Sequence, residues 1–99
     1  MSIQIGNYQL KSKVLLAPMA GTSDKPFRAI CRAQGAALTT SEMVVIQNHL
    51  LNTNKSKHRL DFTGEPTPVS IQIAGSEAEE LAHSAQKALT FGANIIDIN

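Results

Sequence analysis

The sequence predicts an α/β fold in which short parallel strands alternate with helices, and three observations support this prediction. Apolar runs too short for a buried helix recur near positions 14, 37, 69 and 94. Helical segments separate these runs, which start 23 to 32 residues apart. Two short alternating segments around Gly6-Asn7 precede the first run, as in a tight hairpin. We therefore expect the first half of a (β/α)₈ barrel preceded by an N-terminal β-hairpin.

The composition describes a soluble globular chain. Of its 99 residues 42% are hydrophobic and the net charge is +1, which argues against disorder and against a strongly polyanion-seeking protein. No apolar run approaches the roughly 20 residues of a membrane helix, and no signal-peptide core is present. The single cysteine, Cys31, excludes an internal disulfide framework and fits a reducing compartment. We expect a cytoplasmic protein without membrane contact.

The stretch Val14–Arg28 predicts a strand that runs into a loop and then into a helix. The apolar run 14–17 suits a buried strand, and it is broken at Pro18. Small residues continue to Gly21. This loop follows the carboxyl end of a strand, which is where α/β enzymes bind their ligands.

The first helix is expected to run from about Lys25 to Gln34. Asp24 or Ser23 would cap its start, and Gly35 would end it. Its inward-facing stripe is predicted from i, i+3, i+4 spacing to consist of Phe27, Ile30 and Cys31. Cys31 is accordingly interpreted as a small buried hydrophobic residue and not as a nucleophile.

A second strand is predicted at 36–40, and Ser41-Glu42-Met43 follows it at the ligand-binding edge. Glu42 has two interpretations of similar weight: an acid/base group, or a buried carboxylate in a salt bridge with Arg28. Residues 44–51 suit a short helix, and 52–67 a long polar loop. That loop contains a basic cluster, which would form either a solvated surface or a contact to a phosphate backbone: Lys55, Lys57, His58 and Arg59.

A third strand is predicted at 69–73, followed by a helix that extends to about Thr90. Ser76-Glu77-Ala78-Glu79 has the form of a capping box, and Gly92 would end the helix. His83 lies off its apolar stripe and is expected in solvent. The stripe consists of Ala78, Leu81, Ala82, Ala85, Ala88 and Leu89. A fourth strand is predicted at 94–98.

Polar side chains occur near the ends of the third and fourth strands. Alternation places Asp97 and Asn99 on one face of their strand, and Gln72 interrupts an apolar run. Inside a barrel each would need a partner, because an unpaired buried polar group costs about 1–3 kcal/mol. A flat heterocycle rimmed with amide groups would supply partners; alternatively, Gln72 and Asp97 bind each other. The scattered histidines and the single cysteine predict no metal site.

The chain resembles the tRNA-dihydrouridine synthases, in particular the bacterial synthase B type, in four blocks that span it in order. They are A-P-M-A-G-T-S-D-K-P-F-R at 17–28, S-E-M at 41–43, V-S-I-Q-I-A-G at 69–75 and I-I-D-I-N at 95–99. The resemblance implies an FMN enzyme on a (β/α)₈ barrel with a helical C-terminal domain. In this family NADPH reduces the flavin, hydride passes to C6 of a uridine in tRNA, and a cysteine donates a proton to C5.

The resemblance also implies which residues bind the cofactor. Pro18, Met19 and Ala20 match the backbone segment against the flavin, Gln72 matches the side chain bonded to the isoalloxazine ring, and Asn99 matches an asparagine near flavin and uracil. The family's acid cysteine follows that asparagine by three residues, in an N-x-G-C-P run that would lie beyond Asn99. No catalytic residue is therefore assigned in this chain, and Cys31 is not a substitute.

We interpret residues 1–99 as the N-terminal part of an FMN-binding catalytic domain, truncated and without the helical tRNA-binding domain. Such a fragment is expected to be inactive alone. Two alternatives stay open. One is another FMN-dependent barrel that reduces free pyrimidines, and the other is a non-catalytic folding or interaction fragment.

Overall fold

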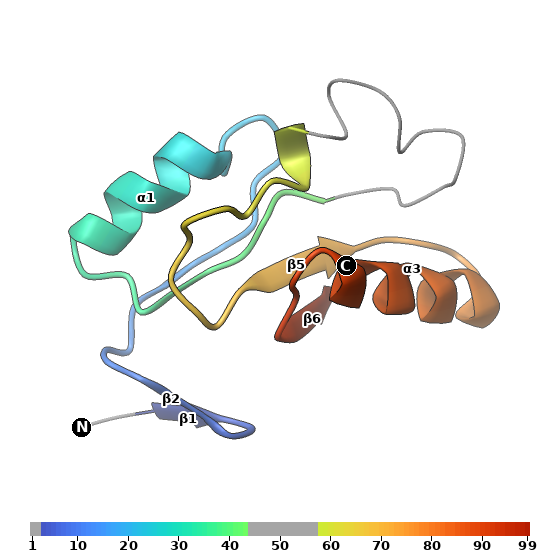
Figure 1. Cartoon of the computed structure of the whole chain (residues 1–99), viewed down its shortest axis with the longest axis horizontal. Helices are drawn as coiled ribbons and strands as arrows, with labels where there is room; N and C mark the ends of the chain where they lie inside the picture. The colour runs from blue at the N-terminus through green and yellow to red at the C-terminus, as the bar shows by residue number, and fades with distance from the viewer. Residues whose placement is uncertain (1–2, 44–57) are drawn as a thin grey trace.

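The structure, a computed structural model, describes residues 3–43 and 58–99 (Figure 1). Its elements follow in the order β1 (Ile3–Ile5), β2 (Tyr8–Leu10), β3 (Leu15–Leu16), α1 (Lys25–Ala33), β4 (Leu38–Thr39), β5 (Ser70–Ile73), α3 (Ala78–Thr90) and β6 (Ile95–Ile98). The α/β class predicted from the sequence is confirmed. The helix predicted over 44–51, and Lys55 and Lys57 of the basic cluster, lie outside the described residues.

Strands β1 and β2 pair antiparallel, with Ile3 opposite Leu10 and Ile5 opposite Tyr8. Gly6 in the connecting turn has φ 56°, a left-handed conformation that strains residues with a side chain. The pair stands to one side of the helices in Figure 1. Leu10 is the buried residue of this pair.

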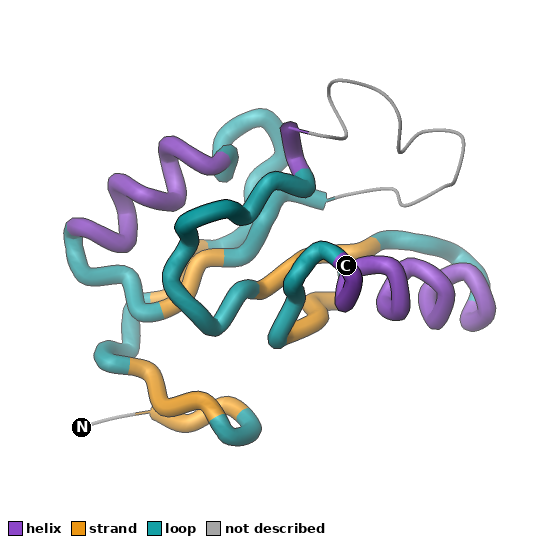
Figure 2. The backbone as a smooth tube through the Cα atoms, in the orientation of Figure 1, coloured by secondary structure: helices purple, strands orange, loops and turns teal. Residues whose placement is uncertain are grey.

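Strands β3 to β6 run parallel and neighbour each other in chain order. Leu16 pairs with Thr39 between β3 and β4, and a parallel bridge between Thr40 and Ser70 joins β4 to β5. Strand β6 pairs with β5 over its whole length. Figure 2 shows these strands between the two helices. Because parallel strands end in the same direction, the loops that follow them gather at one edge.

The main core lies between β5, β6 and α3. Its buried members are Leu60, Val69, Ile71, Ile73, Ala88 and Ala93. The apolar stripe predicted for α3 is too wide, because Leu89 is 61% exposed and Ala78 and Ala82 are also exposed. The helix instead turns Ser84 inward beside Ala88. His83 is exposed, as expected.

Helix α1 has the predicted N-terminal cap but not the predicted inner face. The Asp24 carboxylate accepts a hydrogen bond from the Phe27 N–H at 3.0 Å, and Gly35 follows the helix with φ 111°. Ile30, predicted to face the core, is 62% exposed, whereas Arg28 is 2% exposed. The inner face is polar because buried acceptors on neighbouring segments bind its arginine side chains.

The capping box predicted at Ser76–Glu79 is wrong. Helix α3 has Glu77 as its N-cap residue, and that side chain makes no cap hydrogen bond. Ser76 therefore lies one residue too early for its hydroxyl to reach the first free N–H groups. No helix in the described parts of the chain is long and apolar enough to cross a membrane.

Candidate functional site

The candidate site is the edge at which β3 to β6 end. It combines the loop Pro18–Gly21 after β3, the segment Ser41–Met43 after β4, and the last residues of β5 and β6. Hydrogen bonds connect neighbouring strand ends: the Gln72 N–H donates to the Ser41 hydroxyl at 3.1 Å. The residues predicted to bind a cofactor thus come from loops and strand ends on one side of the parallel strands.

Gln72, Asp97 and Asn99 form a row of polar side chains at this edge. Gln72 is directly opposite Asp97 in the β5–β6 register, so the two share a face of the sheet. The Gln72 amide donates to Asp97 Oδ2 at 2.7 Å, and the Asn99 amide donates to Gln72 Oε1 at 3.5 Å. The structure therefore confirms the alternative in which Gln72 and Asp97 bind each other. Gln72 is 8% exposed, while Asn99 is open to solvent.

The loop after β3 has a fixed backbone and accessible side chains. The buried Ser23 hydroxyl accepts from the Met19 N–H at 2.8 Å and lies 3.1 Å from the Met19 carbonyl, to which it can donate. The Met19 carbonyl also accepts from the Thr22 and Ser23 N–H groups. Met19 is nevertheless 38% exposed. Ala20 and Gly21 are exposed as well, so a flat ligand can approach this loop closely.

Glu42 does not pair with Arg28, so that predicted salt bridge is wrong. Glu42 as a whole residue is 6% exposed, and its carboxylate accepts from the Gly21 N–H at 3.0 Å. Arg59 Nη2 lies 3.4 Å from the same oxygen. Glu42 is thus a buried carboxylate whose partner is Arg59 and not Arg28. The sequence could not distinguish the two arginines, because spacing along the chain does not show which one lies near the carboxylate in space.

Arg28 instead pairs with Glu65. Its guanidinium Nε donates to Glu65 Oε1 at 2.9 Å, Nη2 binds the same oxygen, and Nη1 donates to the Ser23 carbonyl at 2.8 Å. The guanidinium also lies over the Phe62 ring, 5.2 Å from its centroid. Sequence reasoning missed this pair. A pair separated by 37 residues, with one partner in a polar loop, leaves no periodic signal.

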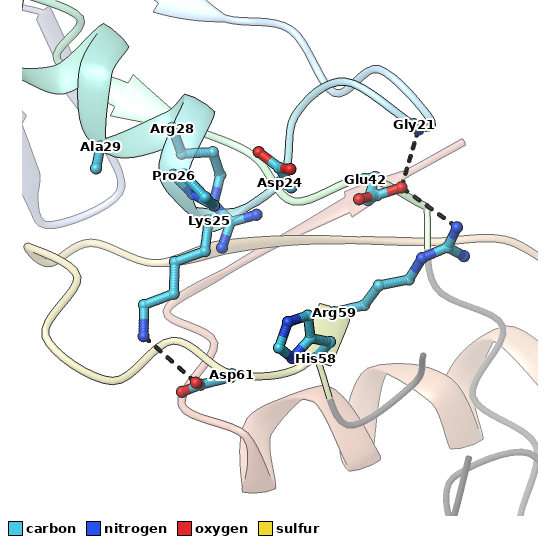
Figure 3. Close-up of a pocket in the computed structure, with 10 residues that line it drawn as sticks. All are labelled: Gly21, Asp24, Lys25, Pro26, Arg28, Ala29, Glu42, His58, Arg59 and Asp61. Carbon is cyan, nitrogen blue, oxygen red and sulfur yellow. Dashed lines mark hydrogen bonds and ion pairs between the residues drawn. The ribbon is translucent and has the colours of Figure 1, made fainter. Parts of the chain in front are cut away.

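A cavity of about 880 Å³ adjoins the loop on the side of α1 (Figure 3). It is lined by Gly21, Asp24, Lys25, Pro26, Arg28, Ala29, Glu42, His58, Arg59 and Asp61. Its cations are paired: Lys25 Nζ lies 3.4 Å from Asp61 Oδ2, and Arg59 contacts Glu42. Gln72 and Asn99 do not line it, so it is separate from the polar row.

Two ionisable groups around this region have shifted pKa values. Hydrogen bonds from the Thr63 side chain and N–H, with Lys25 contributing less, lower the pKa of Asp61 to about 2. Burial lowers the pKa of Arg32 from its usual value, and nearby Glu65 opposes that effect. Arg32 donates to the Thr39 hydroxyl at 3.2 Å and to the Pro68 carbonyl at 3.0 Å, so its charge is used to hold α1 against β4 and the segment before β5.

Cys31 lies near the C-terminal end of α1 and is half-buried. Within residues 3–43 and 58–99, no three His, Cys, Asp or Glu side chains gather in a way that could hold a metal ion.

A family model and individual relatives both show similarity of this chain to dihydrouridine synthases. The model of the dihydrouridine synthase family matches residues 15–99. The proteins called tRNA-dihydrouridine synthase B of Xanthomonas axonopodis pv. citri and Pseudomonas aeruginosa are 50% and 48% identical to this chain over 97 residues. That alignment covers 98% of this chain but 29% of each relative. The protein of the same name from Vibrio vulnificus is 48% identical, with 30% of its length covered.

Proposed function

The chain belongs to the dihydrouridine synthase family, and from that premise we propose that it serves the FMN-dependent, NADPH-driven reduction of the C5=C6 bond of uridine in tRNA. Residues 1–99 form, in this proposal, the N-terminal part of an FMN-binding (β/α)₈ catalytic domain that begins with a β-hairpin. The parallel order of β3 to β6 supports the barrel, since consecutive βα units place their strands side by side in this order.

One observation carries the proposal: a loop of small residues and a row of amide side chains meet at the same edge of the strands. Pro18, Met19 and Ala20 offer close backbone approach to a flat ring system. Gln72 and Asn99 offer amide donors and acceptors for the polar rim of such a ring. The 3.5 Å contact between them is long for a hydrogen bond, so a ligand that bonds to Gln72 Oε1 would not have to displace a strong partner.

The residues therefore fit the isoalloxazine group of FMN. The chemistry that FMN supplies when bound is hydride transfer, with NADPH as the reductant. The proposed role of Pro18–Ala20 is to form the surface against which the ring lies, and the role of Gln72 is to orient it. Asp97 holds the Gln72 amide nitrogen, which leaves the amide oxygen directed to other partners. Asn99 is proposed to lie near both cofactor and uracil.

The substrate and location follow as further parts of the proposal. The relatives are named for tRNA, so we propose tRNA as the macromolecular partner and the cytoplasm as the location. Among the described members of the basic cluster, Arg59 is engaged by Glu42 while His58 is exposed. Of these two residues, His58 is therefore the more open to a phosphate contact.

The test uses the full-length protein that carries this sequence. We expect it to bind FMN stoichiometrically and to consume NADPH when given tRNA that lacks dihydrouridine. Gln72→Ala should weaken FMN binding about tenfold, the magnitude expected for one lost hydrogen bond in a site. Gln86→Ala, the same change at an exposed position on α3, should bind FMN as the wild type does.

Two outcomes would contradict the proposal. One is wild-type protein that retains no flavin. The other is turnover with a free pyrimidine such as dihydroorotate or orotate and none with tRNA, which would identify a different flavin-dependent barrel enzyme.

A further inference from the structure

Three buried polar side chains from different places in the chain bind the backbone of the loop after β3. The Ser23 hydroxyl bonds to both Met19 backbone groups, Arg28 donates to the Ser23 carbonyl, and Glu42 accepts from the Gly21 N–H. As whole residues, Ser23, Arg28 and Glu42 are 0%, 2% and 6% exposed. Water cannot readily replace these bonds, so the loop has a defined backbone position before any ligand arrives.

Glu42 differs from the other two because it comes from another strand. Ser23 and Arg28 belong to the loop itself and to the helix that follows it, whereas Glu42 follows β4 and reaches back 21 residues. Glu42 contacts Gly21, the residue after Ala20, whereas the Ser23 hydroxyl contacts Met19, the residue before it. Gly21 has φ 75°, a conformation in which a side chain would be strained, and its N–H bonds to the carboxylate. A carboxylate acceptor makes this bond stronger than a neutral acceptor would.

Arg59 makes this burial of a carboxylate possible. Its Nη2 lies 3.4 Å from the oxygen that accepts from Gly21, and its side chain is 30% exposed while that of Glu42 is 8% exposed. Figure 3 shows both contacts converging on the Glu42 carboxylate. A buried carboxylate without such a partner would be strongly destabilising. The Arg59 guanidinium therefore stabilises the charge of the Glu42 carboxylate, and that carboxylate binds the Gly21 N–H.

We propose that Glu42 is a positioning residue. Through its hydrogen bond to the Gly21 N–H, it holds the backbone of Pro18–Gly21 in the position in which that loop supports the cofactor ring. This inference rests on the proposed function, which supplies FMN as the ligand of the loop. It assigns Glu42 to support of the loop and not to proton transfer, since the carboxylate acts on the cofactor only through the backbone that it holds.

The experiment compares four variants of the full-length protein with the wild type. Glu42→Leu removes both charge and acceptor, Glu42→Gln keeps an acceptor, and Glu42→Asp keeps the charge but withdraws the oxygen by one methylene. Thr39→Val is the matched control, because Thr39 is also buried, lies on β4 just before Glu42, and contacts Arg32 instead of the loop. Hydrogen–deuterium exchange is measured on cofactor-free protein, and FMN affinity by quenching of flavin fluorescence.

We expect the amides of residues 21–23 to exchange at least about tenfold faster in Glu42→Leu. In that variant the loop can open without breaking a hydrogen bond to a carboxylate. FMN affinity should fall about tenfold with it. Glu42→Gln should restore most of both quantities, Glu42→Asp should resemble Glu42→Leu, and Thr39→Val should change neither. Should Glu42→Leu not fold, the comparison of the Asp and Gln variants decides the matter.

The outcomes separate this inference from the proposed function. Wild-type protein that binds no FMN overturns the proposed function. Wild-type protein that binds FMN, combined with Glu42→Asp exchange or affinity equal to wild type, overturns the inference alone. Equal losses in Thr39→Val and the Glu42 variants would also overturn it, because the effect would then be general destabilisation.

Discussion

Arg28 illustrates at the scale of the single residue how pairing lets a charge occupy a buried position. Its guanidinium is enclosed by Glu65, the Ser23 carbonyl and the Phe62 ring, so each of its three nitrogens donates a hydrogen bond and the group lies over an aromatic ring. The side chains of the pair are 3% and 9% exposed. The spacing of apolar residues predicted that Ile30 faces the core. That spacing contains no information about Glu65, the partner of Arg28, which lies 37 residues away in the sequence.

The buried pair should respond strongly to loss of one partner. Glu65→Leu leaves the Arg28 charge buried and unpaired, and we expect it to lower the free energy of unfolding by about 3–5 kcal/mol. The matched control is Asp61→Asn in the exposed pair with Lys25, which should change the free energy of unfolding far less because solvent screens that pair. Urea denaturation measures both. Equal effects of the two variants would contradict the assignment of Arg28–Glu65 as a buried pair.

The pKa of Asp61 provides a second test at this scale. Thr63→Val removes the hydroxyl that contributes most to the shift, so the pKa should rise from about 2 toward 3.8. Because the folded-state pKa is depressed, Asp61 stabilises the fold above its ordinary pKa, and this contribution disappears as the pH falls toward 2. Carbon-detected NMR titration of the carboxyl group reports the pKa directly. Lys25→Met should produce a smaller rise, and a larger one would reverse the assigned order of causes.

The two helices differ, at the scale of the element, in how their first turns are satisfied. Asp24 caps α1 with a side-chain hydrogen bond, whereas Glu77 occupies the N-cap of α3 without one. The difference follows from side-chain length: an aspartate oxygen reaches the N–H three residues on, and the longer glutamate is a poor cap. Glu79 and Glu80 in the first turn still interact favourably with the helix dipole.

Opposite substitutions at the two N-caps should therefore have opposite effects. Asp24→Ala should reduce the free energy of unfolding by about 0.5–2 kcal/mol, and Glu77→Ser should increase it by up to about 1 kcal/mol. Thermal unfolding followed by circular dichroism measures both changes. Destabilisation by Glu77→Ser would mean that the Glu77 side chain has a role that the cap geometry does not reveal.

At the scale of the whole molecule, stability is concentrated where β5 and β6 meet α3. Ile71 is fully buried within this core, and Ile73 is 1% exposed. Ile71→Ala should lower the free energy of unfolding by about 2–5 kcal/mol, as expected for a large-to-small change in a packed core. Ile30→Ala on the exposed face of α1 is the control, with an expected change within about 0.5 kcal/mol. Similar losses at both positions would show that Ile30 is covered.

Much of the molecule could be predicted from local patterns. In residues 3–43 and 58–99, strands and helices lie within a few residues of their expected positions, because short apolar runs, Asp24 at a helix start and glycines at helix ends act through neighbouring residues. Alternation placed Asp97 and Asn99 on one face of their strand, and the β5–β6 register then brought Gln72 opposite Asp97. The capping box failed by a single residue, which is the scale at which boundaries depend on packing.

The sequence by itself determined the α/β class, the order of the elements and the polar residues at the strand ends, because these depend on periodicity and on backbone preferences within a few residues. Tertiary structure alone decided which charges pair: Arg28 with Glu65, and Glu42 with Arg59 and the Gly21 N–H. Ion pairing depends on the three-dimensional distance between groups and on their removal from water, and neither quantity is encoded in the spacing of residues along the chain.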